Sequence, residues 1–151
     1  MTGPDSGDAP PGRQAAIVAA ARACVGTRFR AQGRVVGLGL DCVGVVLVAA
    51  RAAGVQLREV PAYALSGQHE AMLLEMLGRA GAVRVAAAEA AAGWRVAGDI
   101  AVLVPAPGRL HLGVLTPGGL VHAHAGLGQV VEGPVDQGWS WLGVWHLKGA
   151  H

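Results

Sequence analysis

The chain has 151 residues, the size of one domain, and 52% of them are hydrophobic, so the sequence can bury a sizeable core. Only 15% of the residues are charged, and the net charge is +2 without a lysine or arginine cluster, which argues against a nucleic-acid-binding protein. Arg, Gly or Pro interrupts every apolar run before it reaches the length of a membrane span, so no membrane insertion is expected. The two cysteines, Cys24 and Cys42, form no CxxC motif, so a disulfide framework is not expected.

The chain begins with a segment that we interpret as a disordered tail. Residues 1–12 are rich in Pro, Gly and Asp, and they have neither the basic nor the apolar region of a secretion signal. An alanine-rich stretch at 13–24 predicts the first helix, which Gly26 ends. Residues 27–40 carry several glycines and arginines and are expected to form an exposed loop.

Two more helices are predicted before residue 82. Asp41 has the side chain of a helix N-cap, and the apolar run after it predicts a buried helix to about residue 53, stopped by Gly54. After an irregular segment at 55–67, apolar residues at helical spacing predict a third helix over 68–79.

The rest of the chain alternates short apolar segments with Pro and Gly turns, which predicts an antiparallel sheet. Helices followed by strands indicate an α+β fold, with residues 13–151 forming a single domain. The predicted elements are a strand at 83–85, a turn or short helix at 86–93, and strands at 99–104, 110–115, 120–125, 130–132 and 141–148.

Cys42 would lie in the first turn of the second helix. Unpaired amide N–H groups and the positive end of the helix dipole favour a thiolate there, which makes Cys42 a candidate nucleophile. The alternative for Cys42 is a small buried core residue. Cys24 lies in an alanine-rich helix without a partner motif and is expected in the core.

Three histidines lie on two segments that flank Thr116-Pro117-Gly118-Gly119, a favourable hairpin turn. In this hairpin the numbers of paired residues sum to 235, which places His111 opposite His124 and puts His122 on the same face. If the Cys42 helix packs on that face, His111 can act as the base and His122 can orient it. The alternative is a zinc site made by the three imidazoles.

Four stretches of the sequence, in order over roughly residues 15–145, carry a resemblance to a known family. They are Val25-Gly26-Thr27-Arg28-Phe29-Arg30, Leu40-Asp41-Cys42-Val43-Gly44, Ala97-Gly98-Asp99-Ile100-Ala101-Val102-Leu103, and His111-Leu112-Gly113-Val114 with Val121-His122-Ala123. Together they resemble the NlpC-type cell-wall peptidases, which have a minimal papain-like fold. The resemblance implies that Cys42 is the nucleophile, His111 the general base and acid, and His122 the residue that orients His111, with no cofactor. The implied substrate is the stem peptide of bacterial peptidoglycan, often cut between γ-D-glutamate and a diamino acid.

Residues 41–44 read Asp-Cys-Val-Gly rather than the commoner Asp-Cys-Ser-Gly. Together with Gln32-Gly33-Arg34, they are similar to the subgroup encoded with phage tails and gene-transfer agents. This resemblance implies an enzyme assembled into a virion or phage-like tail, with particle proteins as partners, that acts in the periplasm of the target cell.

Phe29 stands where the family usually has a tyrosine, so the resemblance implies either weaker activity or another group in place of the hydroxyl. Asp41, Phe29 and Arg30 are assigned to substrate binding. Cationic loop residues suit the carboxylates of stem peptides, but solvated loop positions explain Arg28, Arg30 and Arg34 equally well.

Two further functions remain open from the sequence. One is a structural tail-hub module whose chemistry is weakened by Phe29, and the other is an acyltransferase that uses the same triad. Iodoacetamide labelling of Cys42 well below pH 8 would favour catalysis. The remaining tryptophans and histidines are assigned structural positions: Trp139, Trp141 and Trp145 pack the last strand on the core, whereas His69, His146 and His151 are expected at the surface or at the termini.

Overall fold

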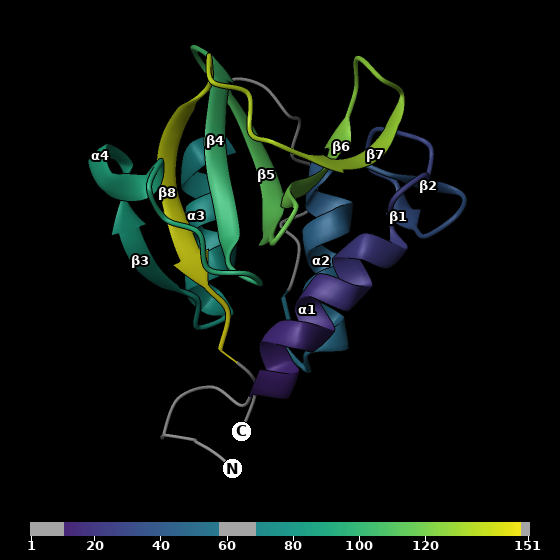
Figure 1. Cartoon of the computed structure of the whole chain (residues 1–151), viewed down its shortest axis with the longest axis horizontal. Helices are drawn as coiled ribbons and strands as arrows, with labels where there is room; N and C mark the ends of the chain where they lie inside the picture. Colours follow the sequence, from purple (N-terminus) through teal and green to yellow (C-terminus); the bar gives the residue numbers. More distant parts are fainter. Residues whose placement is uncertain (1–10, 58–68, 149–151) are drawn as a thin grey trace.

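A computed structural model describes residues 11–57 and 69–148, and Figure 1 labels their helices and strands. The helices are α1 (Pro11–Ala23), α2 (Cys42–Ala52), α3 (His69–Arg79) and α4 (Ala88–Ala91). The strands are β1 (Arg34–Val35), β2 (Gly39–Leu40), β3 (Val83–Ala87), β4 (Ile100–Ala106), β5 (Arg109–Thr116), β6 (Gly119–His124), β7 (Gln129–Gly133) and β8 (Ser140–His146).

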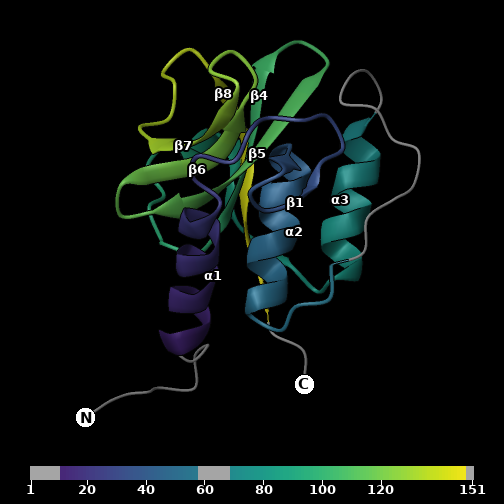
Figure 2. The same cartoon turned by 90° about the vertical axis from the view of Figure 1, so that its right-hand side faces the viewer.

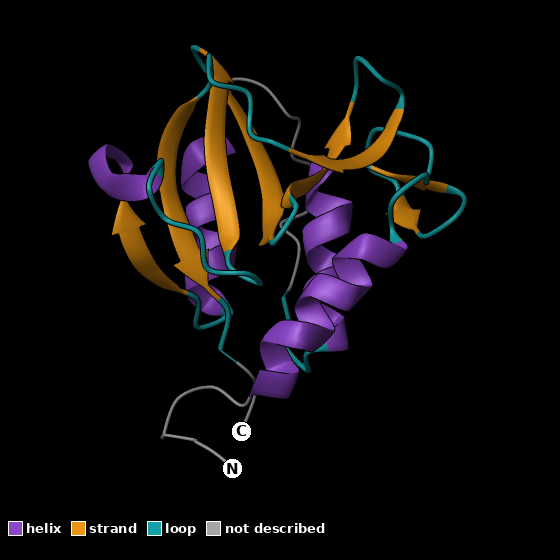
Figure 3. Ribbon diagram, in the orientation of Figure 1, coloured by secondary structure: helices purple, strands orange, loops and turns teal. Residues whose placement is uncertain are grey.

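The centre of the fold is a six-stranded sheet with the order β3-β8-β4-β5-β6-β7, in which every neighbouring pair is antiparallel. Figure 3 shows this sheet beside the longer helices, and Figure 2 shows α1, α2 and α3 from the side. The predicted α+β class and antiparallel sheet are therefore confirmed.

The predicted loop at 27–40 contains a further small sheet, in which β1 pairs with β2. Strands of only two residues are too short to give an alternating pattern, so the sequence did not predict them.

Most predicted elements lie within one or two residues of the observed ones. The first helix begins at Pro11 rather than at residue 13, because proline is well suited to the first turn of a helix. The last strand ends at His146 rather than at residue 148. The other residues of the predicted tail, most of the predicted irregular segment, His151 and the side chain of His69 lie outside the described residues.

Two clusters of buried side chains hold the sheet from its two faces. The larger cluster joins α1, α2 and α3 to one face, and it includes Cys24, which is fully buried as expected. The smaller cluster lies on the opposite face beside α4 and Trp94. Trp145 packs in the larger cluster, whereas Trp139 and Trp141 pack against the smaller one. Within the described ranges, no helix is long and apolar enough to cross a membrane.

Candidate active site

Asp41 fixes the start of α2, as the sequence predicted. It is fully buried, and its Oδ1 atom accepts a hydrogen bond from the amide of Gly44 at 2.9 Å, which is the geometry of an N-cap. The same carboxylate accepts from the amide of Gln32 at 2.8 Å and pairs with Arg34 at 2.7 Å. These contacts tie the β1–β2 hairpin to the first turn of α2 and hold Cys42 in position.

Position 44, directly after Cys42-Val43, has room only for a glycine. A Cβ atom at this position would lie far inside van der Waals contact of the carbonyl oxygen of Gly33. The absence of a side chain lets the 30–34 segment lie directly against α2. The neighbouring Gln32 has a φ of 61°, a left-handed conformation that aims its amide at Asp41.

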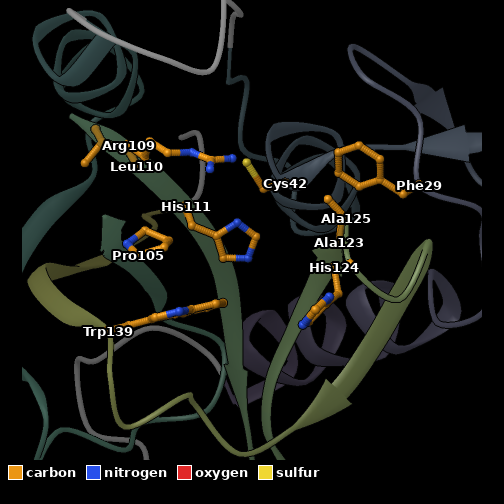
Figure 4. Close-up of a pocket in the computed structure, with 11 residues that line it drawn as sticks. Phe29, Cys42, Pro105, Arg109, Leu110, His111, Ala123, His124, Ala125 and Trp139 are labelled. Carbon is orange, nitrogen blue, oxygen red and sulfur yellow. The ribbon is translucent and has the colours of Figure 1, made fainter. Parts of the chain in front are cut away.

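The hairpin of β5 and β6 has the predicted register. Val114 pairs with Val121, Leu115 with Leu120 and Thr116 with Gly119, so the numbers of each pair sum to 235. The pairing of these two strands stops there. Beyond it, β5 stays paired with β4 and β6 stays paired with β7, which places the two strands on diverging paths (Figure 4). The expected pairing of His111 with His124 is therefore absent from the described ladder, and an opening forms between the strands.

The helix does not pack on the face predicted for it. Leu112 and Val114 of β5, with Val121 and Ala123 of β6, belong to the same buried cluster as α2. The histidines alternate with these residues along the strands, so they extend from the opposite face. Cys42 and His111 therefore approach the opening between β5 and β6 from opposite faces of the sheet.

Cys42 and His111 both line a pocket of about 200 Å³ at this opening (Figure 4). Phe29, which the sequence analysis assigned to substrate binding, lines the same pocket on the side of Cys42. The other lining residues are Pro105, Arg109, Leu110, Ala123, His124, Ala125, Gly126 and Trp139.

His111 and His122 form a hydrogen-bonded pair. The Nε2 atom of His111 lies 2.7 Å from the Nδ1 atom of His122, and the rings meet edge to face. This contact leaves Nδ1 of His111 on the side of Cys42 (Figure 4). The ring of Trp139 packs edge-on against both imidazoles and excludes water from one side of the pair. His122 thus has the position expected of a residue that orients His111.

His124 belongs to the pocket wall rather than to the histidine pair. Its Nδ1 atom accepts a hydrogen bond from the amide of Leu127 at 3.0 Å, which holds the turn after β6. This turn supplies Ala125 and Gly126 to the pocket. Of the two histidines that the sequence offered as partners of His111, the geometry favours His122.

Burial sets the protonation states of the two central groups. Burial raises the pKa of Cys42 to about 12, and the charge of Asp41 adds to this rise, although the backbone amides of Leu112, Val43 and Cys42 oppose it by hydrogen-bonding the sulfur. Burial, with the charges of His122, His124 and Arg109, lowers the pKa of His111 to about 3. The prediction that the helix N-terminus makes Cys42 a thiolate is therefore wrong for the resting protein, because the Cys42 side chain is only 2% exposed. Cys42 rests as a thiol beside a neutral imidazole.

Two residues assigned to substrate binding lie elsewhere. The Asp41 carboxylate is buried under the β1–β2 hairpin with both oxygens bonded, so it supports α2 instead of facing the pocket. Arg30 is exposed, and its side chain lies over Gly39 outside the pocket lining.

Sequence reasoning missed two lining residues, Arg109 and Trp139. Arg109 begins β5 two residues before His111, so its place in the same strand was the available signal. Trp139 comes from the turn before β8, far along the chain from either catalytic candidate, and no local pattern places it there.

His146 is paired rather than a surface residue. Its Nδ1 atom lies 2.8 Å from Oδ1 of the buried Asp99, whose Oδ2 accepts from the indole of Trp94 at 2.8 Å. Asp99 precedes β4 directly, which gives the Gly-Asp pattern of this stretch a structural role. Within the described residues, no three His, Cys, Asp or Glu side chains are grouped so that they could hold a metal ion.

Comparisons with known proteins address the fold. No protein-family model and no curated protein matches the sequence. Among solved structures, the chain is similar to the P60 domain from an antigen of M. avium paratuberculosis, with a TM-score of 0.56, 16% identity and coverage of 88% of this chain and 91% of that chain. The chain shares the fold of this P60 domain. At this identity the likeness establishes the papain-like α+β architecture alone.

Proposed function

We propose that this protein is a cysteine peptidase that cleaves stem peptides of bacterial peptidoglycan. The supporting observation is that Cys42, at the N-terminus of α2, lines one pocket with the hydrogen-bonded pair of His111 and His122. A nucleophile, a base and a group that orients the base are the parts that acyl transfer through a cysteine requires. The proposed substrate class is supported by the resemblance to NlpC-type peptidases and by the fold shared with a P60 domain.

The tautomers follow from the direction of attack. To receive the thiol proton at Nδ1, His111 must carry its own proton on Nε2 and donate it to Nδ1 of His122. The Cys42 sulfur attacks the peptide carbonyl, and the proton moves to His111, which then passes it to the leaving amine. Water, deprotonated by His111, hydrolyses the thioester and releases Cys42 as a thiol.

The start of α2 supplies the electrostatic part of this mechanism. The backbone amides of Cys42 and Val43 are positioned at the sulfur, and in the first turn they are available to a developing oxyanion. Phe29 offers no hydroxyl to assist them. We therefore expect a functional but slower enzyme than a relative with a tyrosine at this position.

The proposal includes delivery on a phage-tail-like particle, with particle proteins as partners and the periplasm of the target cell as the place of action. Its support is the resemblance of residues 41–44 and of Gln32-Gly33-Arg34 to that subgroup.

Digestion of purified peptidoglycan tests the activity. Wild type should release peptide fragments detected by mass spectrometry, and Cys42→Ala should release none. Cys24→Ala is the matched control, because it removes the other buried thiol, which lies just after α1 and outside the pocket lining. Identical digests from wild type and Cys42→Ala would exclude Cys42 as the nucleophile. Acyl transfer to an added amine without cleavage would identify an acyltransferase, and no turnover of either kind would identify a structural module.

A further inference from the structure

The pocket beside Cys42 has an unbalanced charge. Arg109 is the one lining side chain with a permanent charge, and neither an aspartate nor a glutamate is among the described residues of the lining. The rest of the lining is apolar or aromatic apart from two histidines, His111 and His124. Figure 4 shows the guanidinium of Arg109 extending from β5 toward Cys42. A ligand in this pocket therefore meets one cation close to the candidate nucleophile.

Most other arginines in the described part of the chain already have partners. Arg22 pairs with Glu132, and Arg79 pairs with Glu75. Arg84 and Arg95 lie over tryptophan rings. No carboxylate of the described residues forms an ion pair with Arg109, which is exposed at the pocket.

Strand pairing fixes the backbone position of Arg109. It pairs with Ala106 across the tight turn between β4 and β5, where Gly108 has a φ of 75°. The register of the two strands shifts between Leu103 and Ala106, so the turn is offset from the regular ladder. This irregularity places Arg109 at the rim of the pocket, two residues from His111 on the same strand.

The charge of Arg109 also acts on the base. It opposes protonation of His111, and this contributes to the lowered pKa of that imidazole. A carboxylate bound by Arg109 would cancel the opposing charge at the moment when His111 must accept the thiol proton. An anionic substrate is thus suited to this pocket both for binding and for proton transfer.

We propose that Arg109 binds a carboxylate of the substrate, so that the pocket selects peptides with a free carboxylate next to the bond that Cys42 attacks. The inference rests on the proposed peptidase function and assigns to Arg109 the anion-binding role that the sequence offered to the arginines of the 27–40 loop. Arg34 is committed to Asp41, and neither Arg28 nor Arg30 lines the pocket.

Two peptides that differ in one group test the proposal. Both contain a γ-glutamyl-lysine bond, and the glutamyl α-carboxylate is free in one and amidated in the other. Binding is measured by NMR titration of Cys42→Ala, which cannot turn over. An exposed pocket cation should favour the free carboxylate by roughly tenfold in Kd. In Cys42→Ala/Arg109→Gln this preference should fall to about one.

Cys42→Ala/Arg51→Gln is the matched control, because Arg51 lies in the last turn of α2, at the opposite end of the helix from Cys42. It removes the same charge and should keep the tenfold preference. A preference that survives Arg109→Gln, or equal binding of both peptides to Cys42→Ala, would overturn the proposal, as would failure of both to bind. An Arg109-dependent preference in a protein that digests no peptidoglycan would support the anion site and reject the peptidase.

Discussion

Replacing Asp41 with asparagine separates the structural and electrostatic effects of this buried carboxylate. Three donors converge on it: the amides of Gly44 and Gln32 and the guanidinium of Arg34, at 2.9, 2.8 and 2.7 Å. Asparagine keeps one oxygen and puts an NH₂ group in place of the other. At least one donor then faces another donor, and Arg34 loses its counter-charge.

The expected loss of stability follows from these contacts. A buried donor left without an acceptor costs about 1–3 kcal/mol. The weakened bond to Arg34 adds about 1 kcal/mol, because its side chain is 19% exposed and partly solvated. We expect the free energy of unfolding in urea to fall by about 2–4 kcal/mol, and Tm to fall by about 6–12 °C for a chain of this size.

A second measurement tests the electrostatic part. The charge of Asp41 raises the pKa of Cys42, so Asp41→Asn should lower this pKa and speed iodoacetamide alkylation of Cys42 at pH 9. Cys24 is an internal control, because it is fully buried and becomes labelled only if the protein unfolds. Selective labelling of Cys42 therefore reports the reactivity of its thiol and not unfolding of the protein.

Glu75→Gln is the control for stability, since both partners of the Glu75–Arg79 pair are more than half exposed. It should change the free energy of unfolding by less than about 0.5 kcal/mol. An equally small change in Asp41→Asn, or slower alkylation of Cys42, would refute the reasoning.

Three further outcomes are expected. Gly44→Ala should lower the free energy of unfolding by about 1–3 kcal/mol, because its Cβ would meet the carbonyl of Gly33, whereas Gly78→Ala, with open space around it, should be neutral or stabilising in the same urea titration. The free energy of unfolding should fall as the pH drops from about 6.5 toward 4, because the pKa of His111 is lowered to about 3 and that of His122 to about 4 in the folded chain. In this pH range the unfolded chain binds protons that the folded chain does not bind. Urea midpoints at pH 7 and pH 5 check this prediction, and equal midpoints contradict it. His122→Phe should lower kcat by roughly 10²–10⁴, and His122→Gln, which keeps an acceptor for His111, should recover part of the loss; equal activities of the two variants would remove His122 from its orienting role.

The features that the sequence predicted correctly are local ones. The turn at Thr116-Pro117-Gly118-Gly119 determines the register of β5 and β6, because a short turn leaves few ways to pair its flanking strands. Asp41 caps α2 through an amide three residues away, which is also a short-range effect. The helices and the later strands followed from the periodicity of their apolar residues in the same way.

The errors concern contacts between distant segments. Alternation showed that the histidines share a face but not which face α2 covers, since both faces of this sheet are apolar and both are packed. The divergence of β5 from β6 depends on β4 and β7, which hold the two strands apart. The burial of Cys42, which reverses the expected direction of its pKa, depends on that packing and not on the helix start alone.

The divergence of β5 from β6 also limits how this protein can be made more stable. Extending their pairing past Val114 and Val121 would add backbone hydrogen bonds and cross-strand contacts, the usual gains of a regular hairpin. The same change would close the opening between β5 and β6, where Cys42 and His111 line one pocket from the two sides of the described sheet. Selection for thermal stability in this hairpin should therefore yield well-folded proteins that lack the proposed activity. Stabilising substitutions compatible with that activity should be found away from the hairpin, in the helices.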